Sequence, residues 1–539
     1  MDKKKREKIC QRNGYRKILD SCKQAKKDGY EWLWVDTCCI DKRSSAELSE
    51  AINSMYRWYE NAQVCYGYLH DILDSSFPIA RDDERYANGW PEWFSRGWTL
   101  QEMIAPSNLQ FCNKKWWEIS DKRMLACTLE NITGVPEHIL REGLSGNHLC
   151  VVQIMSWGAN WTMSRIEDRA YSLMGLLDVN MPMLYGEGKK AFHRLQLEII
   201  QTSNDQSIFA WSCDEREVRT GSVLADDLSI FCSCFTMELI DPDKFIKSHS
   251  KYMPEEEVRS IEKDRFGTFP IMNRGIQIWL LLCPYSASHS VLQAWLPCRS
   301  DSSSPPAVIN LSLWESNYYR SAQPPFHQGA LKTLQFCQVY LRYQDMLHRN
   351  TALEINDSAI TENGYTYRST CPVKFTGNLF TLTNTDPLCI KVYSNDRTDH
   401  CFAVGFGQCF GKDWIHVISQ VSGYSTLGHL RKDYAQKEYN KMLARVPEHA
   451  QSLDKVHSGA RRYGQVCIMQ TRLHQLTLRT SCVVWKSSRK SGVKFEVFED
   501  PSFRNVSGEW LSFNVDVGGI FSVPVHYLSA LTLPFIGNR

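Results

Sequence analysis

The pattern of apolar residues changes near residue 215, and this change constrains the fold more than any other feature of the sequence. Before that point, apolar residues at helical spacing alternate with short apolar runs. After it, alternating or β-branched runs follow one another with turn residues between them. Helices that alternate with strands are typical of a mainly parallel sheet, and successive short strands are typical of a sandwich. The sequence therefore predicts an α/β domain over 1–211 and a β-rich, sandwich-like region over 215–539.

Composition narrows the class of protein further. Hydrophobic residues make up 43% and charged residues 23% of the chain, so most of it is expected to fold. The net charge of +2 argues against a nucleic-acid partner for the whole protein. No apolar run is long enough to span a bilayer and no secretory signal is recognisable, so we expect a cytoplasmic protein. The 20 cysteines include no CxxC pair, which favours buried thiols over disulfides and predicts no metal site.

Within the first region, the periodicity predicts a regular series of elements. A helix carries Ile18, Cys22 and Ala25 at helical spacing, and a buried strand is predicted over 32–35. A helix over 45–62 begins with a capping box. Further helices are predicted over 99–105 and at 166–177 and 192–199, with strands at 64–69, 108–112 and 207–211. In the second region, strands are predicted at 275–282, 291–296, 308–313, 334–343, 380–382, 414–418, 465–470, 482–485, 493–497 and 510–515, and a solvated helix at 432–441.

The clearest polar cluster follows the predicted strand over 32–35. Asp36 comes directly after this strand, and Cys38, Cys39 and Asp41 follow within five residues. Ligands of open α/β sheets bind outside the carboxyl ends of the strands, so Asp36 and Asp41 are candidate ligand-binding residues. The alternative is that both carboxylates only stabilise the turn by accepting backbone N–H bonds. No histidine is placed beside the thiols by the sequence, so we predict no Cys–His nucleophile.

Other candidates lie at the starts of two predicted helices. Glu47 fits the third helical position of a capping box, a structural role worth about 1 kcal/mol that competes with any catalytic one. The segment 96–102 contains Trp98, Gln101 and Glu102, although a tryptophan is more often a core residue than a platform for a ligand. The chain contains no P-loop, GxSxG, HExxH or kinase signature, which excludes those enzyme classes.

Several blocks of the first region resemble the fungal heterokaryon-incompatibility (HET) domain. The matching blocks are 34–42, 45–56 and 96–102, and the blocks 165–175 and 181–188 resemble an extension found in one large subgroup. Together they cover roughly residues 14–211. The resemblance implies non-self recognition between fused fungal cells, in which the domain triggers cell death or growth arrest. It also implies an α/β fold similar to the TIR domain, with a flavodoxin-like parallel sheet.

The same resemblance implies a candidate activity. Some TIR domains cleave NAD with a glutamate, so by analogy NAD is a candidate substrate, and no other cofactor is expected. Glu47 is the position that best matches the recurrent glutamate of the family and is the candidate catalytic residue. The residues that would line the same crevice are Asp36, Asp41, Trp98, Gln101 and Glu102. The alternative is a non-enzymatic module that acts by self-association or by binding a protein partner of an incompatibility system.

The sequence departs from the family pattern in three ways, one of which is that the β-rich region stands where a nucleotide-oligomerisation module or a repeat array would follow. The family usually begins with an additional strand, whereas this sequence begins in the helix that follows it. A sheet without that strand would expose backbone donors and acceptors, so we expect a truncated, inactive or regulatory version, or else an incomplete gene model. In addition, Trp161 and the pair at 163–164 replace an Arg and a Thr-Thr pair that related sequences tend to carry.

Overall fold

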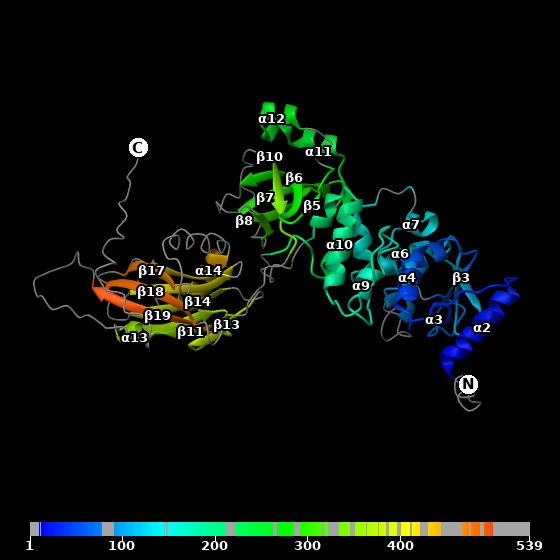
Figure 1. The fold of residues 1–539 in the computed structure, drawn as a ribbon, viewed down its shortest axis with the longest axis horizontal. Coiled ribbons are helices and arrows are strands. Elements are labelled where there is room, and N and C mark those ends of the chain that lie inside the picture. The colour runs from blue at the N-terminus through cyan, green and yellow to red at the C-terminus, as the bar shows by residue number, and fades with distance from the viewer. Residues whose placement is uncertain are drawn as a thin grey trace, which may run out of the picture.

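The fold is described from a computed structural model of the chain (Figure 1). The structure describes residues 10, 12–77, 91–144, 146, 149–211, 221–261, 267–284, 291–314, 317–321, 334–344, 351–362, 364–375, 377–383, 388–395, 400–409, 412–420, 430–443, 466–473, 476–485 and 490–499. The strand predicted at 510–515 lies outside these residues.

The first region combines helices with a small mixed sheet, which confirms the α/β class. Its sheet has the order β1-β2-β3, with β1 parallel to β2 and β2 antiparallel to β3. The sequence predicts a mainly parallel sheet, but over the described residues one of the two strand pairings is antiparallel. The elements up to β3 are α2 (Asn13–Lys27), α3 (Asp36–Cys39), α4 (Ser45–Glu60), β1 (Cys65–Tyr68), η1 (Glu92–Ser95), α5 (Thr99–Ile104), β2 (Leu109–Cys112) and β3 (Glu118–Asp121).

Two strands predicted in this region are wrong. Residues 32–35 form no strand, and the side chain of Trp32 is 90% exposed. The neighbouring Trp34 packs edge-on against Trp58 and Tyr59 of α4, so the aromatic run covers a helix instead of entering a sheet. The segment predicted as a strand at 207–211 begins with the 3-10 helix η2 (Gln206–Phe209), because the Asp205 carboxylate caps it by accepting the Ser207 N–H.

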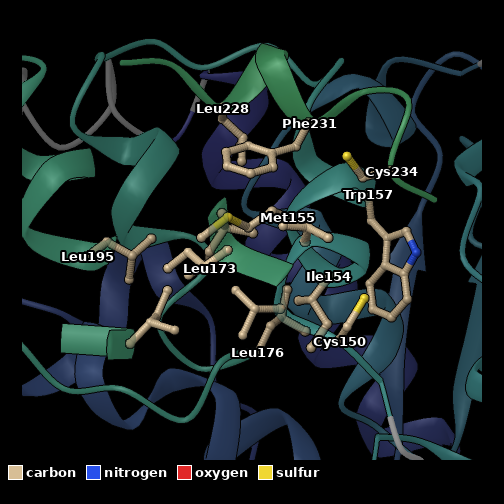
Figure 2. Packing of buried hydrophobic residues seen from close by; sticks show 14 of the residues in the cluster. Cys150, Ile154, Met155, Trp157, Leu173, Leu176, Leu195, Leu228, Phe231 and Cys234 are labelled. Atoms are coloured by element: carbon tan, nitrogen blue, oxygen red, sulfur yellow. The ribbon is translucent and has the colours of Figure 1, made fainter. Parts of the chain in front are cut away.

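The remaining helices of the first region surround a dense apolar core. They are α6 (Ala126–Thr133), α7 (Glu137–Glu142), α8 (Val151–Gly158), α9 (Asp168–Tyr171) and α10 (Lys190–Thr202). The helix predicted at 166–177 is limited to the four residues of α9, and turns follow it. Met155 of α8 lies among Leu173, Leu195 and Leu228 in the middle of the core (Figure 2). Leu228 belongs to the 3-10 helix η3 (Leu228–Phe231), which packs on α8 from the second region.

The second region begins with a seven-stranded sheet of order β4-β7-β8-β9-β10-β6-β5. Strand β7 also pairs with β6, so five of these strands close into a ring, whereas the sequence suggests a sandwich. Two helices, α11 (Pro242–His249) and α12 (Glu255–Ser260), and the 3-10 helix η4 (Ser250–Tyr252) interrupt the strands. The strands are β4 (Glu238–Leu239), β5 (Ile271–Met272), β6 (Gly275–Pro284), β7 (Val291–Arg299), β8 (Pro306–Trp314), β9 (Asn317–Arg320) and β10 (Gln335–Leu341).

Two further sheets follow along the chain. The four-stranded sheet contains β12 (Thr366–Cys371), β14 (Leu388–Asn395), β15 (His400–Cys409) and β16 (Lys412–Gln420). The five-stranded sheet contains β11 (Thr351–Asn356), β13 (Leu379–Leu382), β17 (Val466–Leu473), β18 (Leu476–Trp485) and β19 (Lys490–Glu499). Two helices accompany the sheets, α13 (Ser358–Glu362) and α14 (Leu430–Leu443). Every predicted strand from 275 to 497 therefore overlaps a strand of the structure.

Helix α14 corrects the prediction of a solvated helix at 432–441. Ala435 and Met442 are buried in the core of the four-stranded sheet, and the Met442 thioether packs against Gly405 of β15. The many charged residues of this helix obscure its narrow apolar stripe in the sequence. Two apolar side chains on the same face, seven residues apart, are enough to dock a short helix.

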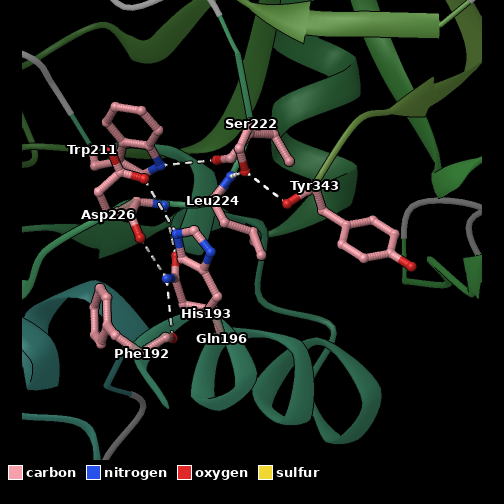
Figure 3. A network of polar contacts seen from close by, with 10 residues as sticks. Phe192, His193, Gln196, Trp211, Ser222, Leu224, Asp226 and Tyr343 are labelled. Atoms are coloured by element: carbon pink, nitrogen blue, oxygen red, sulfur yellow. Dashed lines mark hydrogen bonds and ion pairs between the residues drawn. The ribbon is translucent and has the colours of Figure 1, made fainter. Parts of the chain in front are cut away.

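One continuous core joins the first region to the ring of strands. It extends from Ile40 to Leu341, and polar contacts at its edge connect α10 with the segment 222–226 (Figure 3). The Gln196 amide donates to the Ala225 carbonyl at 2.8 Å and accepts the Ala225 N–H at 2.9 Å. The indole of Trp211 donates to the Val223 carbonyl at 3.0 Å. Apolar and polar packing therefore continues across residue 215.

Candidate functional site

Helices α3, α4 and α5 bring two predicted site residues, Asp36 and Glu102, close to Tyr59. The Tyr59 hydroxyl on α4 forms a hydrogen bond with the Glu102 carboxylate on α5, and Asp36 at the start of α3 is close enough to act on both electrostatically. All three side chains are half-buried. We call this group the Asp36–Glu102 cluster. Two of the six site residues predicted from the sequence therefore lie together in it.

The electrostatics of the cluster are those of a crowded carboxylate pair. Burial, followed by the nearby charge of Asp36, raises the pKa of Glu102 to about 7. The hydrogen bond from Tyr59 and the cations Lys17 and Arg96 oppose this rise in pKa. Because a carboxyl group with a pKa near neutrality can both give and take a proton, Glu102 suits general acid–base chemistry.

The raised pKa of Glu102 predicts a pH-dependent stability. The folded protein binds the Glu102 proton more tightly than the unfolded chain does, so its stabilising effect is complete below the unfolded pKa of about 4.5 and is lost as the pH rises through about 7. We expect the free energy of unfolding of the wild type, relative to Glu102→Gln, to fall between these pH values in urea titrations. The exposed Glu50→Gln variant on α4 serves as the control and should follow the wild type. Parallel pH profiles for wild type and Glu102→Gln would contradict the assignment.

Glu47 and Asp41 lie in a capping structure at the start of α4. The Ser44 hydroxyl accepts the Glu47 N–H at 3.3 Å, and the Glu47 carboxylate accepts the Asp41 N–H at 2.8 Å. The carboxylate of Asp41 accepts two hydrogen bonds from the Arg43 guanidinium, at 2.9 and 2.7 Å. The Ser44 contact is that of an N-cap, whereas the Glu47 carboxylate bonds to Asp41, three residues before the cap, instead of to the Ser44 N–H of a capping box. Both carboxylates therefore have local partners.

Trp98 and Gln101 contact a different part of the fold. Gln101 is fully buried, and its amide donates to the Ser172 carbonyl at 2.6 Å. Trp98 is half-buried and forms a side-chain hydrogen bond with Asp168. Both residues therefore connect α5 to the segment that contains α9.

That segment contains a second polar cluster, which sequence reasoning missed. Glu167 and Asp168 are each only 7% exposed. One Glu167 oxygen accepts the N–H groups of Gly186 and Gly188 at 2.9 and 3.0 Å, and Asp168 accepts the Tyr185 hydroxyl at 2.9 Å. Two backbone N–H groups that converge on one carboxylate fix the conformation of the loop that contains Gly186 and Gly188. The sequence shows an acidic pair at 167–168 and a Gly-x-Gly turn at 186–188, but no pattern in it predicts that these two segments are in contact.

Other features of the described residues add no further centre. No group of three His, Cys, Asp or Glu side chains converges there as a metal site. The thiols of Cys38 and Cys39 are exposed, contrary to the prediction of buried thiols, and their sulfur atoms are 4.0 Å apart. None of the described helices has the length and apolar character needed to cross a membrane.

Comparison with known proteins gives a family match for part of the first region. The family model described as "Heterokaryon incompatibility protein (HET)" matches residues 2–90, and that described as "Domain of unknown function (DUF8212)" matches residues 190–269. The vegetative incompatibility protein HET-E-1 of Podospora anserina is 44% identical over 196 residues, which is 34% of this chain and 14% of that protein. The chain therefore spans only a small part of the length of this relative. No solved structure matches the chain. The protein carries a heterokaryon incompatibility (HET) domain at its N-terminal end.

Proposed function

We propose that this protein acts in heterokaryon incompatibility, and that its first region triggers growth arrest or cell death after fusion of unlike fungal cells. The identity to HET-E-1 over 196 residues supports the role, since that protein is named for vegetative incompatibility. The match of the HET family model to residues 2–90 supports it independently. That the first region triggers growth arrest or cell death is the part of the proposal that the growth of cells expressing this protein would test.

For the chemistry, we propose hydrolysis of NAD at the Asp36–Glu102 cluster, in a region of TIR-like descent. In this reaction water adds to the ribose carbon that carries nicotinamide, the glycosidic bond breaks, and nicotinamide leaves. The observation that supports it is the pKa of about 7 at Glu102, because such a group can accept the proton of the attacking water. Glu47 stays the candidate from the family resemblance, although its carboxylate accepts the Asp41 N–H.

One experiment distinguishes these assignments. The purified full chain is incubated with NAD at neutral pH, and released nicotinamide is measured for the wild type, Glu102→Gln, Glu47→Gln and the control Glu50→Gln. We expect turnover by the wild type and by Glu50→Gln, and a loss of about 100-fold or more in Glu102→Gln, the usual scale for removing a general base. The same loss in Glu47→Gln alone would move the catalytic role to Glu47. Negligible turnover in all four proteins would contradict the enzymatic proposal.

The second candidate function is a non-enzymatic module that acts through self-association. The observation that favours it is the exposure of two tryptophans of the first region, Trp32 at 90% and Trp58 at 40%. Light scattering over a concentration series should then show dimers or larger species that the Trp32→Ser variant loses. A monomer at every concentration would contradict self-association. Growth arrest by a variant without NAD turnover would favour this function over the enzymatic one.

A further inference from the structure

A pocket of about 400 Å³ lies beside α11 at one margin of the seven-stranded sheet. The short strand β4 pairs with β7 so that Glu238 faces Arg299, and β7 pairs with β8 so that Arg299 faces Pro306. Arg299, which lines the pocket, therefore lies opposite residues of two neighbouring strands. The chain continues from β4 into α11, which supplies Lys244 and His249 to the wall. The family model that covers α11 assigns this part of the chain no function.

Two cations, Arg299 and Lys244, and one carboxylate, Asp241, line this pocket. The Arg299 Nη2 atom lies 3.5 Å from a Glu238 oxygen, while its Nε atom is buried and has no hydrogen-bond partner among the described residues. Lys244 is exposed and lines the same pocket. The only carboxylate among the lining residues is that of Asp241, which already accepts the N–H groups of Asp243 and Lys244 at the start of α11. A guanidinium and an ammonium that line one partly buried pocket favour a ligand with negatively charged oxygens, because charge-assisted hydrogen bonds to such oxygens are strong.

His249 gives the pocket a fixed hydrogen-bonding group. Its side chain is only 5% exposed, and its Nδ1 atom lies 2.7 Å from the Phe245 carbonyl. A carbonyl oxygen can only accept, so Nδ1 carries the proton and Nε2 of the neutral ring is an acceptor. Among the described residues no side chain or backbone group bonds to Nε2. Trp295 of β7 holds the ring in place through an edge contact at 5.2 Å.

We propose that this pocket binds a small phosphate monoester. Arg299 and Lys244 hold the phosphate group, and a hydroxyl of the organic part donates to His249 Nε2. A volume of about 400 Å³ is within the range of small-molecule sites and exceeds what a phosphate ion alone fills. The apolar side chains of Leu239, Ile240 and Pro306 supply the wall against which the carbon skeleton of the ligand packs. This binding site is separate from the Asp36–Glu102 cluster and does not depend on the function proposed for it.

Calorimetric titration of the full chain tests the proposal with three probes: ribose 5-phosphate, inorganic phosphate and ribose. We expect ribose 5-phosphate to bind about tenfold more tightly than phosphate, because it fills both halves of the pocket, and ribose not to bind. Arg299→Met and Lys244→Met should each weaken ribose 5-phosphate about tenfold. His249→Phe should weaken ribose 5-phosphate but leave phosphate unchanged. Lys247→Met, a matched change on the same helix outside the pocket lining, should leave all affinities unchanged.

The proposal is overturned if neither phosphate probe binds at millimolar concentration. It is also overturned if Lys244→Met binds ribose 5-phosphate as the wild type does, or if Lys247→Met loses as much affinity. Lys244 is exposed, so its replacement leaves the fold intact and keeps the test decisive even where Arg299→Met does not fold. Circular dichroism of each variant identifies any that is unfolded.

Discussion

Replacement of Arg320 by methionine is expected to lower the free energy of unfolding by about 3 kcal/mol, since two buried carbonyls then lose a charged donor. Arg320 is 3% exposed at the end of β9, and its guanidinium donates to the carbonyls of Phe209 and Trp211. The guanidinium carbon also lies 4.4 Å from the centre of the Trp211 ring. Denaturant titrations followed by tryptophan fluorescence measure the loss.

The matched control for this prediction is Arg259→Met on α12. Arg259 is exposed and forms a surface ion pair with Glu255 at 3.3 Å, so its loss should cost less than about 0.5 kcal/mol. Equal unfolding midpoints for Arg320→Met and the wild type would show that the first region and the ring of strands do not depend on this guanidinium.

Replacement of Gly175 by alanine is expected to cost about 2–3 kcal/mol through overpacking. A Cβ atom at this position would lie 2.3 Å from the Cβ and 2.9 Å from the Cγ of Tyr56 on α4. These atoms are fixed to the helix backbone, so they cannot move aside as the end of a flexible side chain would. The expected result is a lower midpoint in thermal or denaturant unfolding.

Gly14→Ala is the control for this steric effect. No atom lies within 4 Å of a Cβ built at Gly14, which is part of α2. Alanine is the better helix former, so stability should be unchanged or raised by up to ~1 kcal/mol. A loss of stability in Gly175→Ala no greater than in Gly14→Ala would contradict the close packing of Gly175 on α4.

Local patterns predicted those elements whose signals are complete within a short segment. Helix α4 combines a capping box with an apolar stripe, and both are visible in the sequence. Helix α8 escaped prediction because seven of its eight residues are buried, which leaves no contrast between two faces. The aromatic run at 32–35 predicted a strand, since bulky residues favour sheets, but its packing partner is a helix.

The site was predictable only as a set of residue types. Asp36 and Glu102 were candidates from their positions after a predicted strand and at a helix start, and the structure brings them near each other. Their meeting depends on Tyr59 and on how α4 packs against α5, which is a long-range contact with no local signal. Glu47 was ambiguous for the opposite reason, because a capping box in the sequence offers a complete local role for it, and its partners in the structure lie within seven residues of chain.

The core that extends from Ile40 to Leu341 limits how the first region can be fused to another protein. A fragment cut after residue 211 would lose Leu228 and Phe231, which cover α8, and would leave Gln196 without the backbone groups of Ala225. The apolar surface exposed in this way would favour aggregation of the fragment. A fragment that keeps this core intact therefore extends at least through Leu341, and such a fragment also contains the pocket beside α11.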